Sequence, residues 1–102
     1  MARREKTFLV ESYVPHLDEP TAGAISSRYR AAVVRLGEEG VALRWVQSFA
    51  LFEEETYLCI VGASDLDHVL RLNERSGNRV DHVAEIVAVR ESGRSTAARD
   101  VP

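Results

Sequence analysis

Residues 43–61 read LRWVQSFALFEEETYLCIV, and this stretch decides the fold. Two runs rich in β-branched and aromatic residues flank three consecutive glutamates, which is typical of two strands joined by a polar turn. With a three-residue turn at Glu53–Glu55, side-chain alternation places the following residues on one face of a hairpin: Trp45, Gln47, Phe49, Tyr57, Cys59 and Val61. That face is too apolar to lie in water, so we expect another surface to pack against it and cover it.

The sequence before the hairpin predicts a strand and a helix. Residues 7–14 alternate with the period of a strand, and Pro15 ends it. Beyond a group of capping candidates at residues 18–21, apolar side chains recur at helical spacing, among them Tyr29 and Leu36. A glycine at position 37 or 40 is expected to stop this helix.

The hairpin strands themselves are predicted over residues 41–52 and 56–62. After them, Ser64 and Asp67 predict the capped start of a second helix, which Gly77 ends. Residues 82–90 predict a fourth strand.

The order strand, helix, strand, strand, helix, strand predicts an α+β protein of ferredoxin-like βαββαβ topology with a four-stranded antiparallel sheet. Both helices then cover one face of this sheet. Parity predicts that they cover the even-numbered residues: Phe8, Val10, Val46, Ser48, Ala50, Leu58, Ile60, Ala84, Ile86 and Ala88. The opposite face is predicted to carry Leu9, Glu11, Tyr13, Leu43, Trp45, Gln47, Phe49, Leu51, Tyr57, Cys59, Val61, Val83, Glu85 and Val87. Because most of these are large and apolar, we expect two copies to pack sheet to sheet as a dimeric α/β barrel.

Length and composition predict one domain. A chain of 102 residues, 45% hydrophobic and 28% charged, is ordinary for a globular protein and buries roughly 65% of its unfolded surface. We expect a flexible N-terminus at residues 1–6, the ferredoxin-like domain at residues 7–90, and a disordered polar tail at residues 91–102.

Several classes of partner and location are disfavoured. A formal charge of −3 with scattered cations gives no attraction for nucleic acid, and residues 56–62 contain one aromatic residue where an RNA-recognition module needs more. No apolar run is long enough to span a membrane, and no export signal follows the charged start. A lone cysteine, Cys59, excludes an intramolecular disulfide, so we expect a cytoplasmic protein.

Two glutamates form the candidate site. If the first and last strands pair, Glu11 and Glu85 lie nearly opposite each other, with Tyr13, Trp45, Gln47, Tyr57 and Cys59 lining the same space. Two close carboxylates would share a proton, bind a cation or act as a general base. The alternative is that both glutamates are solvated or paired with an arginine such as Arg44.

Other candidate groups carry less chemistry. Cys59 is predicted to be a buried small hydrophobe rather than a nucleophile, because no histidine is near it in sequence. The three histidines His16, His68 and His82 form no HxH or HExxH spacing. A metal site would therefore need ligands from separate strands.

Four features carry a resemblance that covers residues 6–89: Glu11, the run WVQSF at 45–49, the run YLC at 57–59, and residues 73–77 followed by Asp81. In these features the chain resembles a family of small bacterial ferredoxin-like proteins, catalogued as a domain of unknown function, that includes a nickel-binding member. The resemblance implies a divalent metal such as nickel. Many family members carry histidine at the positions of Gln47 and Asn73, whereas amides bind nickel less well, so we expect poor nickel affinity.

The sequence therefore predicts a cytoplasmic homodimer that binds a metal ion or a small ligand between its sheets, next to Glu11 and Glu85. The alternative is a cofactor-independent enzyme of monooxygenase or cyclase type with Glu11 or Glu85 as its general base.

Overall fold

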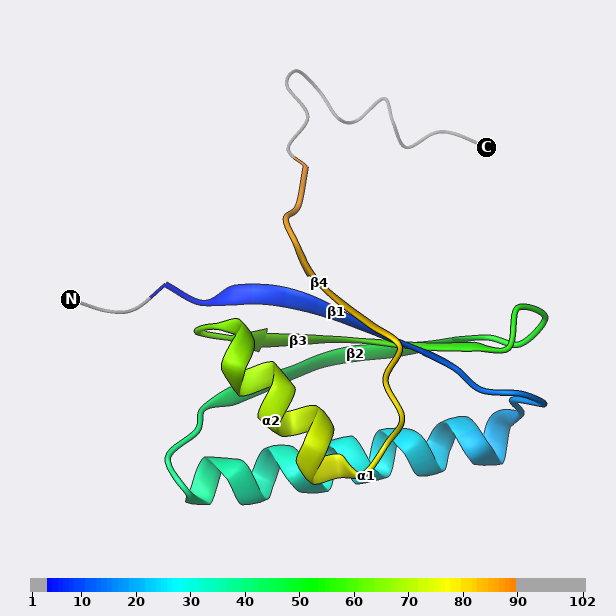
Figure 1. Ribbon diagram of the computed structural model, residues 1–102, viewed down its shortest axis with the longest axis horizontal. Coiled ribbons are helices and arrows are strands. Elements are labelled where there is room, and N and C mark those ends of the chain that lie inside the picture. The colour runs from blue at the N-terminus through cyan, green and yellow to red at the C-terminus, as the bar shows by residue number, and fades with distance from the viewer. Residues whose placement is uncertain (1–3, 90–102) are drawn as a thin grey trace.

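In the computed structural model, which describes residues 4–89, four strands form an antiparallel sheet in the spatial order β2-β3-β1-β4. Along the chain the elements are β1 Lys6–Tyr13, α1 Glu19–Glu38, β2 Leu43–Leu51, β3 Thr56–Ala63, α2 Leu66–Ser76 and β4 His82–Ile86. Both helices lie on one side of the sheet, as Figure 1 shows. The predicted ferredoxin-like fold is thereby confirmed. The predicted tail lies outside the described residues, and no described helix is long and apolar enough to cross a membrane.

The first helix has conventional ends. Asp18 is its N-cap and accepts a hydrogen bond from Thr21 N at 2.9 Å, with Pro20 in the first turn. At the other end Gly40 takes a left-handed conformation with φ 93°, which allows Val41 N to donate to Leu36 O. Of the two predicted stop residues, Gly40 is the one that turns the chain.

The second helix starts differently from the prediction. Its N-cap is Asp65, whose carboxylate accepts from His68 N at 3.1 Å, and the predicted cap Ser64 instead contacts His68 Nδ1 through its hydroxyl. Gly77 ends the helix with φ 76°, as predicted. The fourth strand is shorter than expected, since β4 ends at Ile86.

The core lies between the sheet and the helices. Its buried apolar residues are Phe8, Val10, Leu17, Ile25, Tyr29, Ala32, Leu36, Val41, Tyr57, Cys59, Val61, Ala63, Val69 and Leu72. In β1 the even-numbered residues face the helices, as predicted. In β3 it is the odd-numbered residues that do so, and in β4 it is Val83 and Glu85. The parity prediction is therefore wrong for both of these strands.

The length of the β2–β3 turn explains the error in β3. Leu51 pairs with Thr56, so the turn has four residues, Phe52–Glu55, and not the three that were expected. Glu55 N donates to Phe52 O at 3.0 Å, and Glu55 has φ 52°, a conformation that allows the chain to reverse there. One extra turn residue shifts the register by one, which exchanges the two faces of the following strand.

A β-bulge changes the phase within β2. Trp45 pairs with Val61, but Gln47 pairs with Ile60, so Val46 is an extra residue in the ladder. Trp45, before the bulge, therefore faces the helices, whereas Phe49, after it, faces the other side. The prediction that both lie on the exposed face is wrong for Trp45.

No described helix covers the second side of the sheet, which we call the open face. The strand pairings assign to it Thr7, Leu9, Glu11, Tyr13, Arg44, Gln47, Phe49, Leu51, Thr56, Leu58, Ile60, Gly62, His82, Ala84 and Ile86. Phe49 is 44% exposed and Leu51 45% exposed. The open face is thus apolar over much of its area although it meets solvent.

Candidate functional site

The predicted pair of glutamates does not form. In the β1–β4 register Glu11 lies opposite His82, and Glu85 lies opposite Phe8. Because Phe8 faces the helices, Glu85 belongs to the helix-covered side, at the edge of the sheet, while Glu11 lies on the open face. A shared carboxylate site of Glu11 and Glu85, as metal ligands or as a proton-sharing pair, is therefore wrong on register alone.

Three other predicted lining residues belong to the core. The Tyr29 ring of α1 lies 5.7 Å from the Trp45 ring and is stacked on Tyr57 at 6.1 Å between centroids. Cys59 is fully buried, and this burial raises the pKa of its thiol to about 12. Almost no thiolate exists near neutral pH at such a pKa, so Cys59 is a packing residue rather than a nucleophile. Trp45, Tyr57 and Cys59 lie on the helix-covered side of the sheet, so they cannot line a ligand site on the open face.

The open face keeps Glu11, Tyr13 and Gln47 of the predicted set and adds His82. Glu11 and His82 are directly opposite on neighbouring strands, where Cβ atoms lie about 4.5–5.5 Å apart. The two residues are thus cross-strand neighbours, next to apolar residues such as Leu9 and Leu58. His82 was predicted to begin a strand, but its role could not be seen without the register.

Tyr13 belongs to a second polar group at one end of the sheet. Its hydroxyl donates to Glu55 Oε1 at 2.9 Å, and the other oxygen of that carboxylate accepts from His16 N at 2.8 Å. These hydrogen bonds lower the pKa of Glu55, with the His16 N–H as the largest cause, and the same carboxylate raises the pKa of Tyr13. His16 and Glu55 both have positive φ, 61° and 52°, which is uncommon for residues other than glycine. Glu55 therefore joins two strained loops.

This contact predicts a titration result. Replacing Glu55 with glutamine should lower the pKa of Tyr13 toward 10.0, because the neighbouring negative charge is lost. A tyrosine whose pKa is raised in the folded state adds stability below its unfolded pKa and loses it as the pH rises through the folded value. Ultraviolet titration of tyrosinate measures the effect, and Glu54→Gln in the same turn is the control. Equal curves for the two variants would contradict the Glu55–Tyr13 contact.

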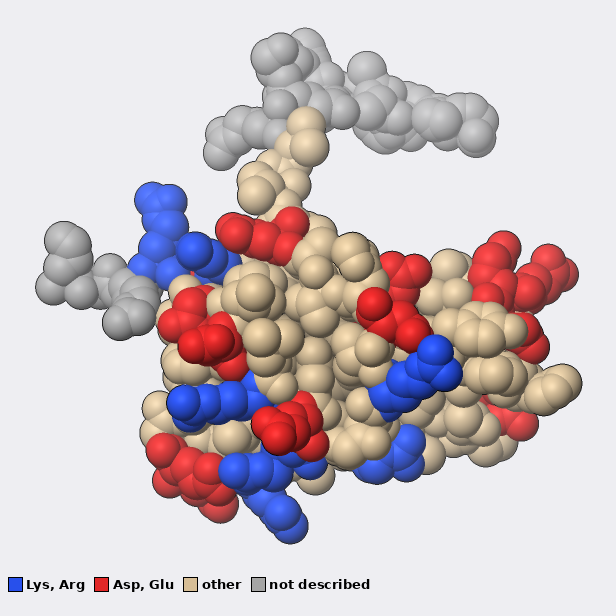
Figure 2. All heavy atoms as spheres, in the orientation of Figure 1, with Lys and Arg blue, Asp and Glu red and all other residues tan. Residues whose placement is uncertain are grey.

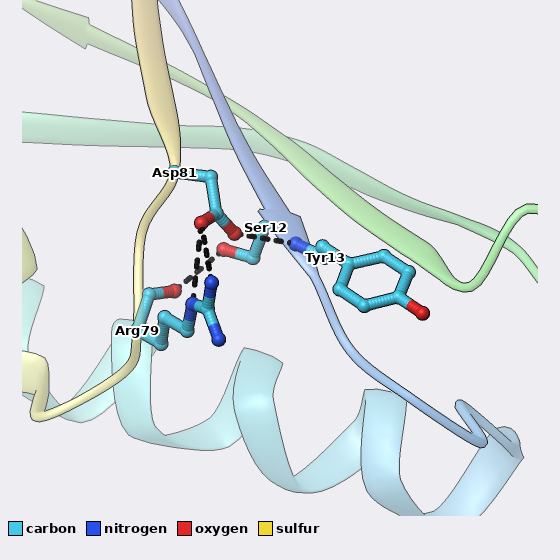
Figure 3. Close-up of polar contacts among 4 residues, drawn as sticks. All are labelled: Ser12, Tyr13, Arg79 and Asp81. Atoms are coloured by element: carbon cyan, nitrogen blue, oxygen red, sulfur yellow. Dashed lines mark hydrogen bonds and ion pairs between the residues drawn. The ribbon is translucent and has the colours of Figure 1, made fainter.

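Figure 3 shows a third polar group, which the sequence did not reveal. Asp81 Oδ2 accepts from Tyr13 N at 2.7 Å, and Asp81 Oδ1 accepts from Arg79 Nη2 at 2.9 Å. Ser12, which is buried, donates its hydroxyl to Arg79 O at 2.7 Å. Asp81 Oδ2 accepts the hydrogen bond of Tyr13 N just beyond the Glu11–His82 pair, where a further residue of β4 would otherwise accept it, and so it marks the end of the β1–β4 ladder. The hydrogen bonds from Tyr13 N and from Arg79 lower the pKa of Asp81.

Among residues 4–89 no group of three or more His, Cys, Asp and Glu side chains could hold a metal ion. Gln47 lies on the open face, whereas Asn73 belongs to α2 on the other side of the sheet, where its Oδ1 is buried without a described hydrogen-bond partner. The two positions at which the resemblance implies histidines are therefore separated by the sheet.

No family model matches the chain, and no curated protein matches it. Its structure is similar to the crystal structure of SCO4226 from Streptomyces coelicolor A3(2), with a TM-score of 0.68 and 16% sequence identity. The match covers 82% of this chain and 99% of the other. At this identity the similarity shows the fold alone, and the resemblance to a nickel-binding family stays a prediction.

Proposed function

We propose that the protein is a homodimer in which two open faces pack against each other and hold a small polar ligand or a shared metal ion beside Glu11 and His82. The observation that carries the proposal is the composition of the open face, whose middle holds Glu11, Gln47 and His82 among apolar residues and whose ends carry further polar groups. A sheet face that stays in water usually carries polar side chains.

The apolar middle is contiguous across all four strands. Leu9 lies between Ile60 and Ala84, and Leu58 lies opposite Phe49. Large exposed apolar patches mark interaction surfaces in soluble proteins. In such a surface the apolar core is covered first, and polar groups form its rim.

Polar groups occupy both ends of the face. At one end Arg44 Nη2 pairs with Glu5 Oε1 at 2.9 Å, and the Glu5 carboxylate lies over Gly62, where an added Cβ would be 2.6 Å from it. At the other end Tyr13 bonds to Glu55. A rim at each end of an apolar strip suits a two-fold interface, in which the same patch of both subunits is buried.

A second copy supports ligand binding because it supplies what one chain lacks. Two chains facing each other bring two carboxylates and two imidazoles to the space between the sheets. Imidazole suits zinc, copper and nickel, whereas carboxylate and hydroxyl groups also suit small polar molecules. Within residues 4–89 one chain contributes Glu11 and His82, so in this proposal metal binding depends on the dimer.

Nucleic acid is not the proposed partner. Figure 2 shows basic and acidic side chains interspersed over the face in view, with acidic groups gathered at the end where Figure 1 places the β2–β3 turn. A nucleic-acid surface needs a continuous basic patch.

Two measurements on the full chain test the proposal. Sedimentation at about 10 μM should give the mass of a dimer, because interfaces of standard size have micromolar or lower dissociation constants. Native mass spectrometry reports any retained ligand at the same time. A monomer at this concentration would overturn the proposal.

Titration with nickel then tests the site. Nickel binding should be weak in the unmodified chain, and Glu11→Gln and His82→Gln should each weaken it about tenfold or more. Glu85→Gln is the matched control, since Glu85 is a strand carboxylate on the other side of the sheet. Equal losses in Glu11→Gln and Glu85→Gln would show that the site is not on the open face, and no nickel binding at all would leave a small polar molecule as the ligand.

An enzyme is the second candidate function, favoured by the position of Glu11 directly opposite His82 on the neighbouring strand. A carboxylate beside an imidazole is the usual pairing for general acid–base catalysis. In this role Glu11 is the base, and Glu85, which lies on the other side, is not. Glu11→Gln would then abolish turnover of a substrate that still binds, whereas a pure binding protein would show no turnover to lose.

A further inference from the structure

A cavity of about 250 Å³ lies on the helix side of the sheet, away from the open face. Three segments form it: the end of β1 with the loop that follows, one side of α1, and the α2–β4 connection. Val14, Pro15 and Ile25 give it mostly apolar walls. Its volume is below the roughly 300–1,000 Å³ of sites for drug-sized ligands, so it fits only a small molecule.

Two guanidinium groups line this cavity, and no described residue that lines it is acidic. Arg28 Nε donates to Asn78 Oδ1 at 2.6 Å, and Asn78 Nδ2 in turn donates to Ile25 O at 3.3 Å. Arg79 is held by Asp81 through Nε and Nη2. Both arginines are exposed, as is Pro15, whereas Val14 is half-buried and Ile25 is buried.

The two arginines differ in what they offer a ligand. Arg79 faces a carboxylate, which offsets its charge. Arg28 is oriented through Nε by a neutral amide, and within residues 4–89 its Nη groups make no hydrogen bond to the protein. A fixed guanidinium with free Nη donors matches a planar carboxylate, because the two can form parallel hydrogen bonds.

We infer that this cavity binds a small monocarboxylate with an apolar body, the carboxylate at Arg28 and the body against Val14, Pro15 and Ile25. Asn78 is a positioning residue, since it holds the Arg28 side chain in place. Arg79 adds positive charge without a second full anion site, because Asp81 already pairs with it. The site is independent of the dimer and of the ligand proposed at Glu11 and His82.

Benzoate is a suitable probe, and benzamide is its neutral analogue of the same shape. Nuclear magnetic resonance of the ¹⁵N-labelled full chain should show saturable shifts of the Gly77, Asn78 and Arg79 amides with benzoate up to about 20 mM, the range in which weak ligands saturate. Benzamide should bind at least about tenfold more weakly, because it lacks the charge that Arg28 recognises.

Variants locate the contact. Arg28→Gln should weaken benzoate about tenfold or more, and Arg79→Gln should weaken it less. Arg30→Gln, an exposed arginine two residues along the same helix, is the control and should leave binding unchanged. The proposal fails if benzoate gives no saturable shift, if benzamide binds as well as benzoate, or if Arg28→Gln and Arg30→Gln behave alike.

Discussion

Replacing Tyr29 with alanine is expected to lower the free energy of unfolding by about 3–5 kcal/mol, the usual cost of removing a buried aromatic ring. Tyr29 is 0% exposed and lies between the rings of Trp45 and Tyr57. Domains of this kind are stable by only about 5–15 kcal/mol, so the variant should be close to unfolding. Urea denaturation followed by the fluorescence of Trp45, the single tryptophan, measures the change.

Tyr29→Phe is the matched control for this prediction. The Tyr29 hydroxyl is buried and makes no hydrogen bond within residues 4–89, although Ser12 lies close enough to influence its pKa, which burial raises. Removing an unsatisfied hydroxyl while keeping the ring should be neutral or slightly stabilising. A loss in Tyr29→Phe as large as in Tyr29→Ala would show that the hydroxyl, and not the ring, carries the stability.

Replacing Leu58 with glutamate is expected to raise the dissociation constant of the proposed dimer by about 100-fold or more, since each factor of ten corresponds to about 1.4 kcal/mol. Leu58 lies in the middle of the open face, between Glu11 of β1 and Phe49 of β2. In a two-fold dimer the substitution places two negative charges in an apolar interface, where they are costly without partners. Sedimentation over a range of micromolar concentrations measures the shift.

Val34→Glu controls for the added charge. Val34 is 61% exposed on α1, away from the open face, so the same change there should leave the dimer intact. A dimer that survives Leu58→Glu, with circular dichroism unchanged, would place the interface elsewhere. Equal dissociation in both variants would indicate an effect of net charge rather than of the open face.

The order and type of all six elements could be predicted from the sequence because each is coded locally. Helical spacing around Tyr29, Pro15 after the first strand, and the glycines at 40 and 77 act within a few residues of where they stand. The faces of β2 and β3 were harder. They depend on one extra residue in the turn and on one in the bulge at Val46. Trp45 and Phe49 have the same parity in the sequence, so nothing in the alternation shows that they lie on opposite sides of the sheet.

The candidate site was predicted less accurately than the fold, because it joins residues that are far apart in the chain. Glu11 was identified correctly as a polar residue on the open face, but its neighbour is His82 and not Glu85. A strand register is set by cross-strand packing, which no local pattern contains. The sequence also does not show that Asp81 ends the β1–β4 ladder, because its carboxylate accepts a backbone hydrogen bond from Tyr13 N that a strand carbonyl would usually accept.

The bulge at Val46 lets one strand serve two surfaces. Without it, Trp45 and Phe49, four residues apart, would project to the same side, and β2 would have to choose between filling the core and meeting a partner. Deleting Val46 would force that choice on the whole strand. With the bulge, odd-numbered residues of β2 before Val46 pack against the helices, and odd-numbered residues after it lie on the open face. The packing of the core and the composition of the open face can therefore change independently in this strand.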